Sequence, residues 1–324
     1  MERGIIALNS AERVKRAVHF EKPDRAPILL YNRDFEQSDI IITEVVTHWG
    51  GENRDVSEWG FTWEKLDGTM GQPKEPLMKS WDEPGCLRVP DASDPTRFAA
   101  VPEIKRKYGD KYYVASLALT GFTVMTFLRG FSETLEGLYE EPESVGALAD
   151  AVFGFEEQII EKCRRYGFGA VAFFDDWGTQ TNMLISPTMW REFFKPRYKK
   201  QFDLVHECGM DVYFHCCGQI EAIIPDFIEI GVDILNLSQP NVFNIEELGR
   251  AYSGKTCFLC PISYQTTSLS GTKEEIYAEA KLLIENLGTP NGGFIGYVEE
   301  YASIGLSEEN YQNCVGAFLE QGKY

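Results

Sequence analysis

The stretch DVYFHCCGQI, residues 211–220, runs from apolar residues into His215, Cys216 and Cys217 and then a glycine. Successive side chains of a β-strand point to opposite faces. One face of this stretch therefore carries Tyr213, His215 and Cys217, while the other carries apolar residues and Cys216. The pattern predicts a strand that packs one face under helices and directs polar groups from its carboxyl end to the other face.

Runs of this kind recur along the chain, separated by helical patterns: 26–32, 112–119, 170–177, 211–217, 233–238, 256–262 and 292–298. FTWEKLDG (61–68) is either a further strand of the same sheet or part of a side hairpin. Strands alternating with helices indicate a parallel sheet with both faces covered. About eight such units predict a single α/β domain over residues 1–324, a (β/α)8 TIM-like barrel with N-terminal additions. A doubly wound sheet is the alternative.

The helical segments carry recognisable end signals. Asn9 in NSAE and Thr272 in GTKEE open segments of capping-box type, in which the side-chain oxygen accepts a backbone N–H. The segment 186–209 starts with Ser186 as cap, and Pro196 within it predicts a kink or a split. The helix after Thr272 is expected to bury one apolar stripe: Ile276, Ala280, Leu283 and Leu287.

Composition and charge exclude several classes of protein. The net charge of −19 disfavours binding to nucleic acid or to anionic lipid. The chain has no apolar run of about 18 residues, so no membrane span is expected, and residues 1–20 lack the apolar core of a signal peptide. The eight cysteines are too sparse for a disulfide framework. We therefore expect a cytoplasmic protein, and the sequence leaves open whether it forms a homo-oligomer.

The pair His215 and Cys217 is the strongest candidate for a metal site. An imidazole and a thiolate two residues apart at the end of a strand can reach one zinc ion. A third ligand must come from elsewhere, and Cys260, Glu299 and Glu300 are candidates because each follows or ends another strand. The alternative is that His215 hydrogen bonds within the barrel and both cysteines are small buried residues.

Polar side chains follow other predicted strands too. Active sites of TIM barrels lie at the carboxyl ends of the strands, so these groups are expected to converge. The paired carboxylates Asp175 and Asp176 could supply a base, a metal ligand or a substrate hydrogen bond, and a solvated helix-entry turn is the alternative. Further candidates at strand ends are Asn32, Glu36, Trp177, Gln180 and Asn236.

Several segments together resemble the uroporphyrinogen decarboxylase superfamily, and most closely its zinc- and corrinoid-linked methyltransferases. The matching segments are SAERVKRAVHFEKPDRAPI, FFDDWGTQTNMLISPTMWREFFKPRYKK, FHCCGQIEAIIPDFIEIGVDILNLSQP, GTKEEIYAEAKLLIENLG and GGFIG. The resemblance implies a TIM-like barrel and zinc held by His215 and Cys217. The sequence differs from the family at two places. In GGFIGYVEEY, Glu300 stands about where the methyltransferases carry a further cysteine. In LLYNRDF, only Arg33 matches an arginine-rich motif of the decarboxylases.

The resemblance implies an O-demethylating methyltransferase that passes a methyl group from a methoxylated, aromatic compound to the cobalt of a corrinoid protein. Zinc would be held by His215, Cys217 and Glu300, and Asp175 or Asp176 would orient the substrate or donate a proton. The expected substrate-binding residues are Asn32, Glu36, Phe174, Trp177, Gln180, Asn236 and Tyr297. The alternatives are a methylcobalamin:thiol methyltransferase, a metal-free uroporphyrinogen decarboxylase and a non-catalytic corrinoid-binding barrel.

Overall fold

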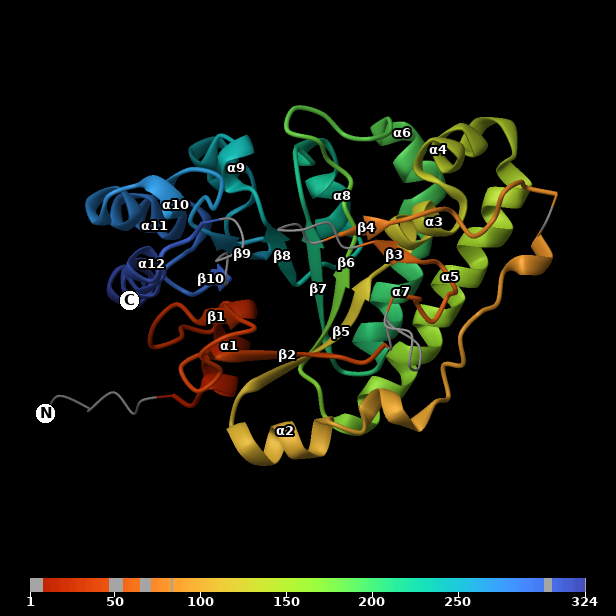
Figure 1. Ribbon diagram of the computed structural model, residues 1–324. Helices are drawn as coiled ribbons and strands as arrows, with labels where there is room; N and C mark the ends of the chain where they lie inside the picture. The colour runs from red at the N-terminus through yellow and green to blue at the C-terminus, as the bar shows by residue number, and fades with distance from the viewer. Residues whose placement is uncertain (1–7, 47–54, 65–70, 83, 300–304, 324) are drawn as a thin grey trace, which may run out of the picture.

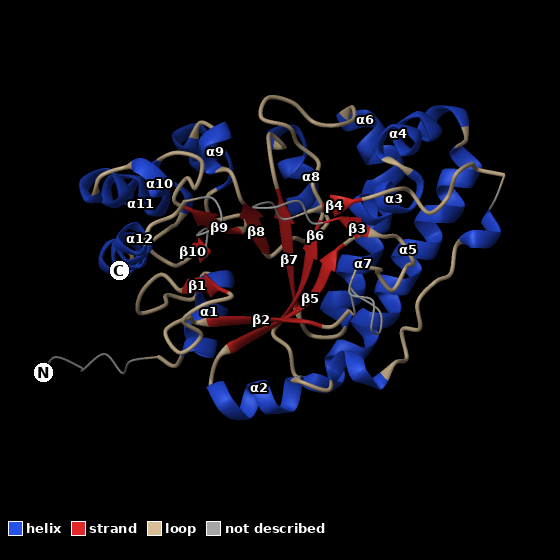
Figure 2. Cartoon of the chain, viewed as in Figure 1, coloured by secondary structure: helices blue, strands red, loops and turns tan. Residues whose placement is uncertain are grey.

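The chain folds as a (β/α)8 barrel in a computed structural model that describes residues 8–46, 55–64, 71–82, 84–299 and 305–323 (Figure 1). Eight parallel strands form one sheet in the order β1-β10-β9-β8-β7-β6-β5-β2. Figure 2 shows the strands in the middle of the molecule with helices on both sides of them. The TIM-like barrel predicted from the strand–helix alternation is confirmed, and the doubly wound alternative is wrong.

The barrel strands are mostly apolar and buried, as expected for strands whose two faces are both covered. They are β1 Ile28–Tyr31, β2 Ile40–Glu44, β5 Tyr112–Leu119, β6 Ala170–Phe174, β7 Asp211–Cys216, β8 Ile234–Leu237, β9 Cys257–Pro261 and β10 Phe294–Glu299. The strand β2 was not predicted, because no helix separates it from β1. The described part of the stretch 61–68, residues 61–64, contains β3 Trp63–Glu64. This strand pairs antiparallel with β4 Gln72–Pro73 outside the barrel, so the side-hairpin alternative is the correct one.

Helices surround the barrel and close its amino-terminal end. They are α1 Ser10–Val18, α2 Val101–Tyr108, α3 Gly121–Arg129, α4 Phe131–Glu140, α5 Pro142–Cys163, α6 Pro187–Met189, α7 Lys195–Glu207, α8 Ile224–Glu229, α9 Ile245–Tyr252, α10 Thr267–Ser270, α11 Lys273–Leu287 and α12 Glu308–Gln321. In the described ranges, no helix is both long and apolar enough to cross a membrane.

Two apolar layers follow from the alternation of strand side chains. The smaller layer fills the barrel and includes Tyr213 of β7, Leu259 of β9 and Ile295 of β10. Val14 and Val18 of α1 join this layer, so α1 plugs the barrel and is the predicted N-terminal addition. The larger layer lies between the strands and the outer helices.

The sheet opens between β1 and β2, and two polar side chains bridge the gap. The backbone N–H of Leu30 donates to Ser38 Oγ at 3.0 Å, and that of Ile28 donates to Asp39 Oδ2 at 3.0 Å. Asp39 also binds Arg13 and Arg25 through ion pairs of 2.8 Å each. Side chains therefore replace part of the missing strand pairing and keep the barrel nearly closed.

The predicted helix ends are confirmed. Asn9 accepts the backbone N–H of Glu12, and Thr272 forms a capping box with Glu275. The stripe predicted for α11 is buried. Residues Trp190–Phe194 form a π-helical turn between α6 and α7, shortly before Pro196. The helical run 187–207 is therefore continuous, and the proline alters its hydrogen-bond pattern without splitting it. The wider turn accommodates a proline that has no N–H to donate.

Candidate metal centre

His215 and Cys217 leave β7 on the same side, as the alternation predicted. Tyr213, two residues earlier, belongs to the barrel interior, whereas Cys216 packs in the outer layer. There Cys216 Sγ accepts the backbone N–H of Trp177 at 3.2 Å. The half-buried imidazole of His215 therefore faces the mouth of the barrel, and Cys216 faces away from it.

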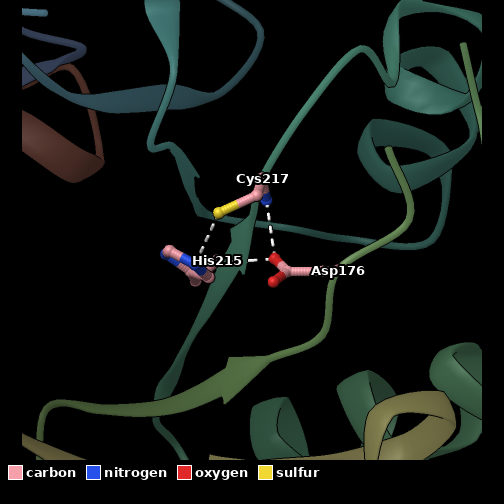
Figure 3. A group of neighbouring side chains, drawn as sticks. All are labelled: Asp176, His215 and Cys217. Carbon is pink, nitrogen blue, oxygen red and sulfur yellow. Dashed lines mark hydrogen bonds and ion pairs between the residues drawn. The ribbon is translucent and has the colours of Figure 1, made fainter. Parts of the chain in front are cut away.

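Asp176 joins this pair from the loop after β6, and the three side chains point toward one another (Figure 3). His215 Nε2 lies 3.6 Å from Cys217 Sγ and 3.7 Å from Asp176 Oδ1. Tetrahedral zinc, with bonds of 2.0 to 2.3 Å, holds such ligand atoms about 3.4 to 3.6 Å apart. The nitrogen, sulfur and oxygen donors are those that zinc prefers, so the residues present fit this ion.

Asn236 of β8 fixes which nitrogen of His215 is available. Its Nδ2 donates to the backbone oxygen of Leu259 at 2.8 Å, which leaves Oδ1 directed at His215 Nδ1, 2.6 Å away. Tyr213 also donates to this Oδ1, at 3.0 Å. Because Oδ1 can only accept, His215 Nδ1 carries the proton and Nε2 presents a lone pair to the site. Asn236 is fully buried with its polar atoms engaged, so it orients the imidazole from behind.

The loop that carries Cys217 is held against the loop of Asp176. The Cys217 backbone N–H donates to Asp176 Oδ1 at 2.8 Å, and that of Gln219 donates to the oxygen of Thr179 at 2.8 Å. Gly218 has a φ of 76°, and a Cβ there would lie 2.3 Å from the backbone of Gly178. Only glycine fits this close approach, which brings the thiol and the carboxylate together.

The electrostatics of the group favour a bound cation. Burial raises the pKa of the Cys217 thiol far above its usual range, and the neighbouring Asp176 carboxylate raises it further. A thiolate beside a carboxylate is therefore costly unless a positive charge lies between them. A divalent ion would provide that charge and keep the thiol deprotonated.

The structure distinguishes among the third ligands considered from the sequence. Leu259 faces the barrel interior, so the next residue, Cys260, faces the outer layer, where it is fully buried. Cys260 therefore cannot be a ligand in a metal site at the mouth of the barrel. Glu299 ends β10, and its Oε2 accepts the hydroxyl of Tyr297 at 2.5 Å. Its charge contributes to the raised pKa of Cys217, but it is not part of the three-residue group. Glu300 lies outside the described residues.

Asp175 and Trp177 do not face the mouth. The strand ends at Phe174, and the Asp175 carboxylate turns to α3, where it accepts the backbone N–H groups of Phe122 and Thr123 at 2.8 Å each and the hydroxyl of Tyr198. Burial raises the pKa of Asp175 to about 7. Trp177 is fully buried in the aromatic outer core. The residues predicted as a catalytic acid and a substrate wall thus serve a helix terminus and the core.

The other predicted substrate residues are dispersed. The ring of Phe174 packs on His215 with centroids 4.9 Å apart, and Tyr297 lies buried in the barrel interior. Asn32 and Gln180 are exposed in loops. The prediction placed Glu36 wrongly at the mouth of the barrel. Its backbone oxygen accepts a hydrogen bond from Lys111, which directly precedes β5, so Glu36 lies toward the amino-terminal end of the strands.

Sequence reasoning missed Tyr264, in the loop after β9. Burial and the neighbouring Cys217 raise the pKa of its phenol to about 12, while hydrogen bonds with Gln239 and Ser238 oppose the shift. Gln239 Oε1 also accepts the backbone N–H of Gly218 at 2.9 Å. The signal that could have found Tyr264 is its position just past a strand's carboxyl end.

A cavity of about 300 Å³ lies near the metal group, although His215, Cys217 and Asp176 are not among the residues that line it. Phe174 connects the two, since its ring packs on His215 and also lines the cavity. The segment 55–64 also lines the cavity and contributes Trp59, Phe61 and Trp63. A mainly apolar cavity with a few polar side chains is the usual form of a small-molecule site.

The chain is thus a (β/α)8 barrel in which three side chains that could hold a metal ion, His215, Cys217 and Asp176, meet at the carboxyl ends of β6 and β7. Residues 60–299 match the family described as uroporphyrinogen decarboxylase (URO-D). Since the match spans well over half of the 324 residues, the chain belongs to this family.

Among solved structures, a methyltransferase from Methanosarcina mazei superposes with a TM-score of 0.78 at 16% identity, covering 97% of this chain and 99% of that one. This similarity establishes the shared fold. A D-psicose 3-epimerase solved in the presence of D-fructose matches with a TM-score of 0.43 at 10% identity, covering 68% and 82% of the two chains. No curated protein sequence matches significantly.

Proposed function

We propose that the protein is a zinc-dependent methyltransferase that removes a methyl group from a methoxylated aromatic compound and passes it to the Co(I) of a separate corrinoid protein. The observation that carries the proposal is the group of His215, Cys217 and Asp176 beside an aromatic cavity in a barrel of the URO-D family. The fold shared with the Methanosarcina mazei methyltransferase supports the methyltransferase type.

His215, Cys217 and Asp176 would hold the ion, and Glu300 remains a predicted additional ligand. Zinc bound there would act as a Lewis acid that stabilises negative charge on the ether oxygen as the methyl group leaves. A carboxylate among the ligands donates less charge than a second thiolate would, which favours an oxygen leaving group. Asp176 thus takes the role of a ligand rather than the proposed proton donor.

The protein's contribution to catalysis is orientation. The cavity and Phe174 would hold the ring of the methyl donor with its ether oxygen toward His215. The corrinoid cobalt would supply the electron pair that accepts the methyl carbon. The electrons of the broken carbon–oxygen bond would stay on the oxygen, which would take a proton from water. The corrinoid would approach from the mouth of the barrel, opposite the leaving oxygen.

The proposal is tested by measuring zinc content together with methyl transfer from a methoxyarene to reduced cobalamin. His215→Ala and Cys217→Ala should each lose stoichiometric zinc and nearly all activity. Cys260→Ala is the matched control, because this cysteine is equally close to a strand end but faces the outer helices, and it should retain both. Full activity of either site variant, or of a zinc-free preparation, would rule the mechanism out.

Membership of the URO-D family makes porphyrinogen decarboxylation the second candidate. A porphyrinogen carries many carboxylates and needs free cationic partners. Arg33, which matches the arginine-rich motif, already pairs with Glu308 at 2.7 Å and lies over the ring of Tyr311. Uroporphyrinogen turnover by zinc-free protein would establish the decarboxylase, and methylation of a thiol by methylcobalamin would establish the thiol methyltransferase.

A further inference from the structure

An exposed leucine lies at the carboxyl end of a barrel strand. Leu119, the last residue of β5, is 40% exposed, whereas the residues before it in this strand are all buried. A single exposed leucine is common on protein surfaces and indicates nothing by itself. Leu119 differs because the backbone departs from a regular strand to place it at the end where active sites of TIM barrels lie.

The strand β5 contains a bulge just before Leu119. Its pairing with β6 runs in register up to Ser116, which lies beside Ala172. After Ser116 the register shifts, and the pairing resumes with Leu119 beside Phe174. Two residues of β5 therefore stand opposite one residue of β6, which is the count that defines a β-bulge.

The bulge changes the face of the sheet on which Leu119 lies. Side chains of β5 alternate, with Val114 in the barrel interior and Ala115 and Leu117 in the outer layer. Continued alternation would direct residue 119 to the outer helices. The extra residue instead brings Leu119 into register with Phe174, which packs against the interior layer.

Leu119 thereby joins a row of side chains at the mouth of the barrel. Phe174 of β6 is in register with His215 of β7, and register partners on adjacent strands point to the same side of a sheet. Leu119, Phe174 and His215 therefore lie side by side across three neighbouring strands. Leu119 and Phe174 also line the cavity, so the row connects this cavity with the metal group.

The backbone of the bulge is energetically unfavourable. Ala118 has a φ of 56°, in the left-handed region that residues with a Cβ disfavour. Ser116 Oγ accepts the backbone N–H of Ala118 at 3.0 Å and holds this conformation, and both residues are buried. Bulges often redirect a side chain beside an active site, and unfavourable backbone conformations concentrate there.

We propose that the bulge of β5 positions Leu119 as an apolar contact for the ring of the methyl donor, which makes Leu119 a specificity-determining residue of the site. The inference rests on the proposed function for the identity of the ligand. A ring that lies against Leu119 and Phe174 is next to His215, where the proposed reaction needs the ether oxygen. Since 40% of Leu119 is exposed, covering it with a ring should contribute about 3- to 10-fold to the affinity.

The test is equilibrium binding of methoxybenzene to the full chain in the presence of zinc and without corrinoid protein, measured by titration calorimetry. Leu119→Ala and Leu119→Asn should each weaken binding by about 3- to 10-fold. Leu119→Met keeps an apolar side chain of similar volume and should bind nearly as the wild type does. The matched control is Leu282→Ala, because Leu282 of α11 is a leucine of 39% exposure, and this variant should leave binding unchanged.

Two further measurements separate contact with a ligand from a structural role. Because Leu119 is partly exposed, Leu119→Asn should leave the midpoint of thermal unfolding nearly unchanged. Ala118→Gly should keep the affinity for methoxybenzene, since glycine adopts a φ of 56° readily, whereas Ala118→Val should weaken it, since a β-branched residue disfavours that φ. Wild-type affinity in Leu119→Ala or in Ala118→Val, or an equal loss in Leu119→Met, would overturn the inference.

Failure of this inference is distinguishable from failure of the proposed function. If Leu119→Ala binds the methyl donor normally but needs more cobalamin for half-maximal methyl transfer, Leu119 contacts the corrinoid, and the inference is wrong while the proposed reaction stands. The expected loss of donor binding in Leu119→Ala, together with no methyl transfer to reduced cobalamin by the wild type, would support the contact and refute the proposed reaction.

Discussion

Replacing Asn236 with leucine removes a side chain that touches neither the ion nor the substrate, yet the geometry predicts a loss of metal affinity. The amide accepts from His215 and Tyr213 and donates to Leu259. Loss of three buried hydrogen bonds at about 1 kcal/mol each should lower the free energy of unfolding by about 2 to 4 kcal/mol. Without the acceptor at Nδ1, His215 is no longer held in the tautomer that presents Nε2 to zinc.

Such orienting partners contribute about 10- to 100-fold to metal affinity, or about 1.4 to 2.8 kcal/mol. The assay is competition for zinc between the folded protein and a chelator at neutral pH. Asn236→Asp keeps an acceptor for His215 and should retain most of the affinity. Tyr213→Phe removes the other hydrogen bond to the same oxygen, so it should lower stability while leaving zinc binding nearly unchanged. Wild-type affinity in folded Asn236→Leu would refute the orienting role.

Two further outcomes follow from the same contacts. In Gly218→Ala the added Cβ would lie 2.3 Å from the backbone of Gly178 and should push the Cys217 loop away from it. Both the midpoint of thermal unfolding and the affinity for zinc should therefore fall. An unchanged midpoint would contradict the close approach of the two loops. Burial raises the pKa of Glu156 from 4.5 to about 8. Between these two pH values the folded chain keeps a proton that the unfolded chain releases. The free energy of unfolding should therefore fall as the pH rises through this range, by up to about 1.4 kcal/mol per pH unit. Glu156→Gln should remove that slope in urea unfolding between about pH 5 and 8, and identical slopes in the two proteins would show that Glu156 is ionised in the folded state.

The features that the sequence predicted correctly depend on neighbours along the chain. Alternation over two residues placed His215 and Cys217 on one face of β7 and Cys216 on the other. Caps at Asn9 and Thr272 depend on contacts within one helical turn. Repetition of strand and helix then identified the barrel, because parallel strands must be covered on both faces.

The local sequence determines less well where a strand ends, and the wrong predictions for the site residues arise from this. The run 170–177 was expected to remain extended, but β6 stops at Phe174. The chain then turns, so Asp175 caps α3 and only Asp176 reaches His215. The unpaired N–H groups at the start of α3 attract the carboxylate, and this contact joins segments far apart in sequence.

By itself, the sequence determined the barrel, the family resemblance and the imidazole–thiol pair, since these follow from local periodicity and from short motifs. Only the tertiary structure decided that Asp176 joins the group, that Asn236 supports the imidazole and that Cys260 faces outward. It also decided that a mainly apolar cavity lies near the group. Each of these depends on the register between neighbouring parallel strands, such as Phe174 beside His215. That register is fixed by packing between residues distant along the chain, which no local pattern encodes.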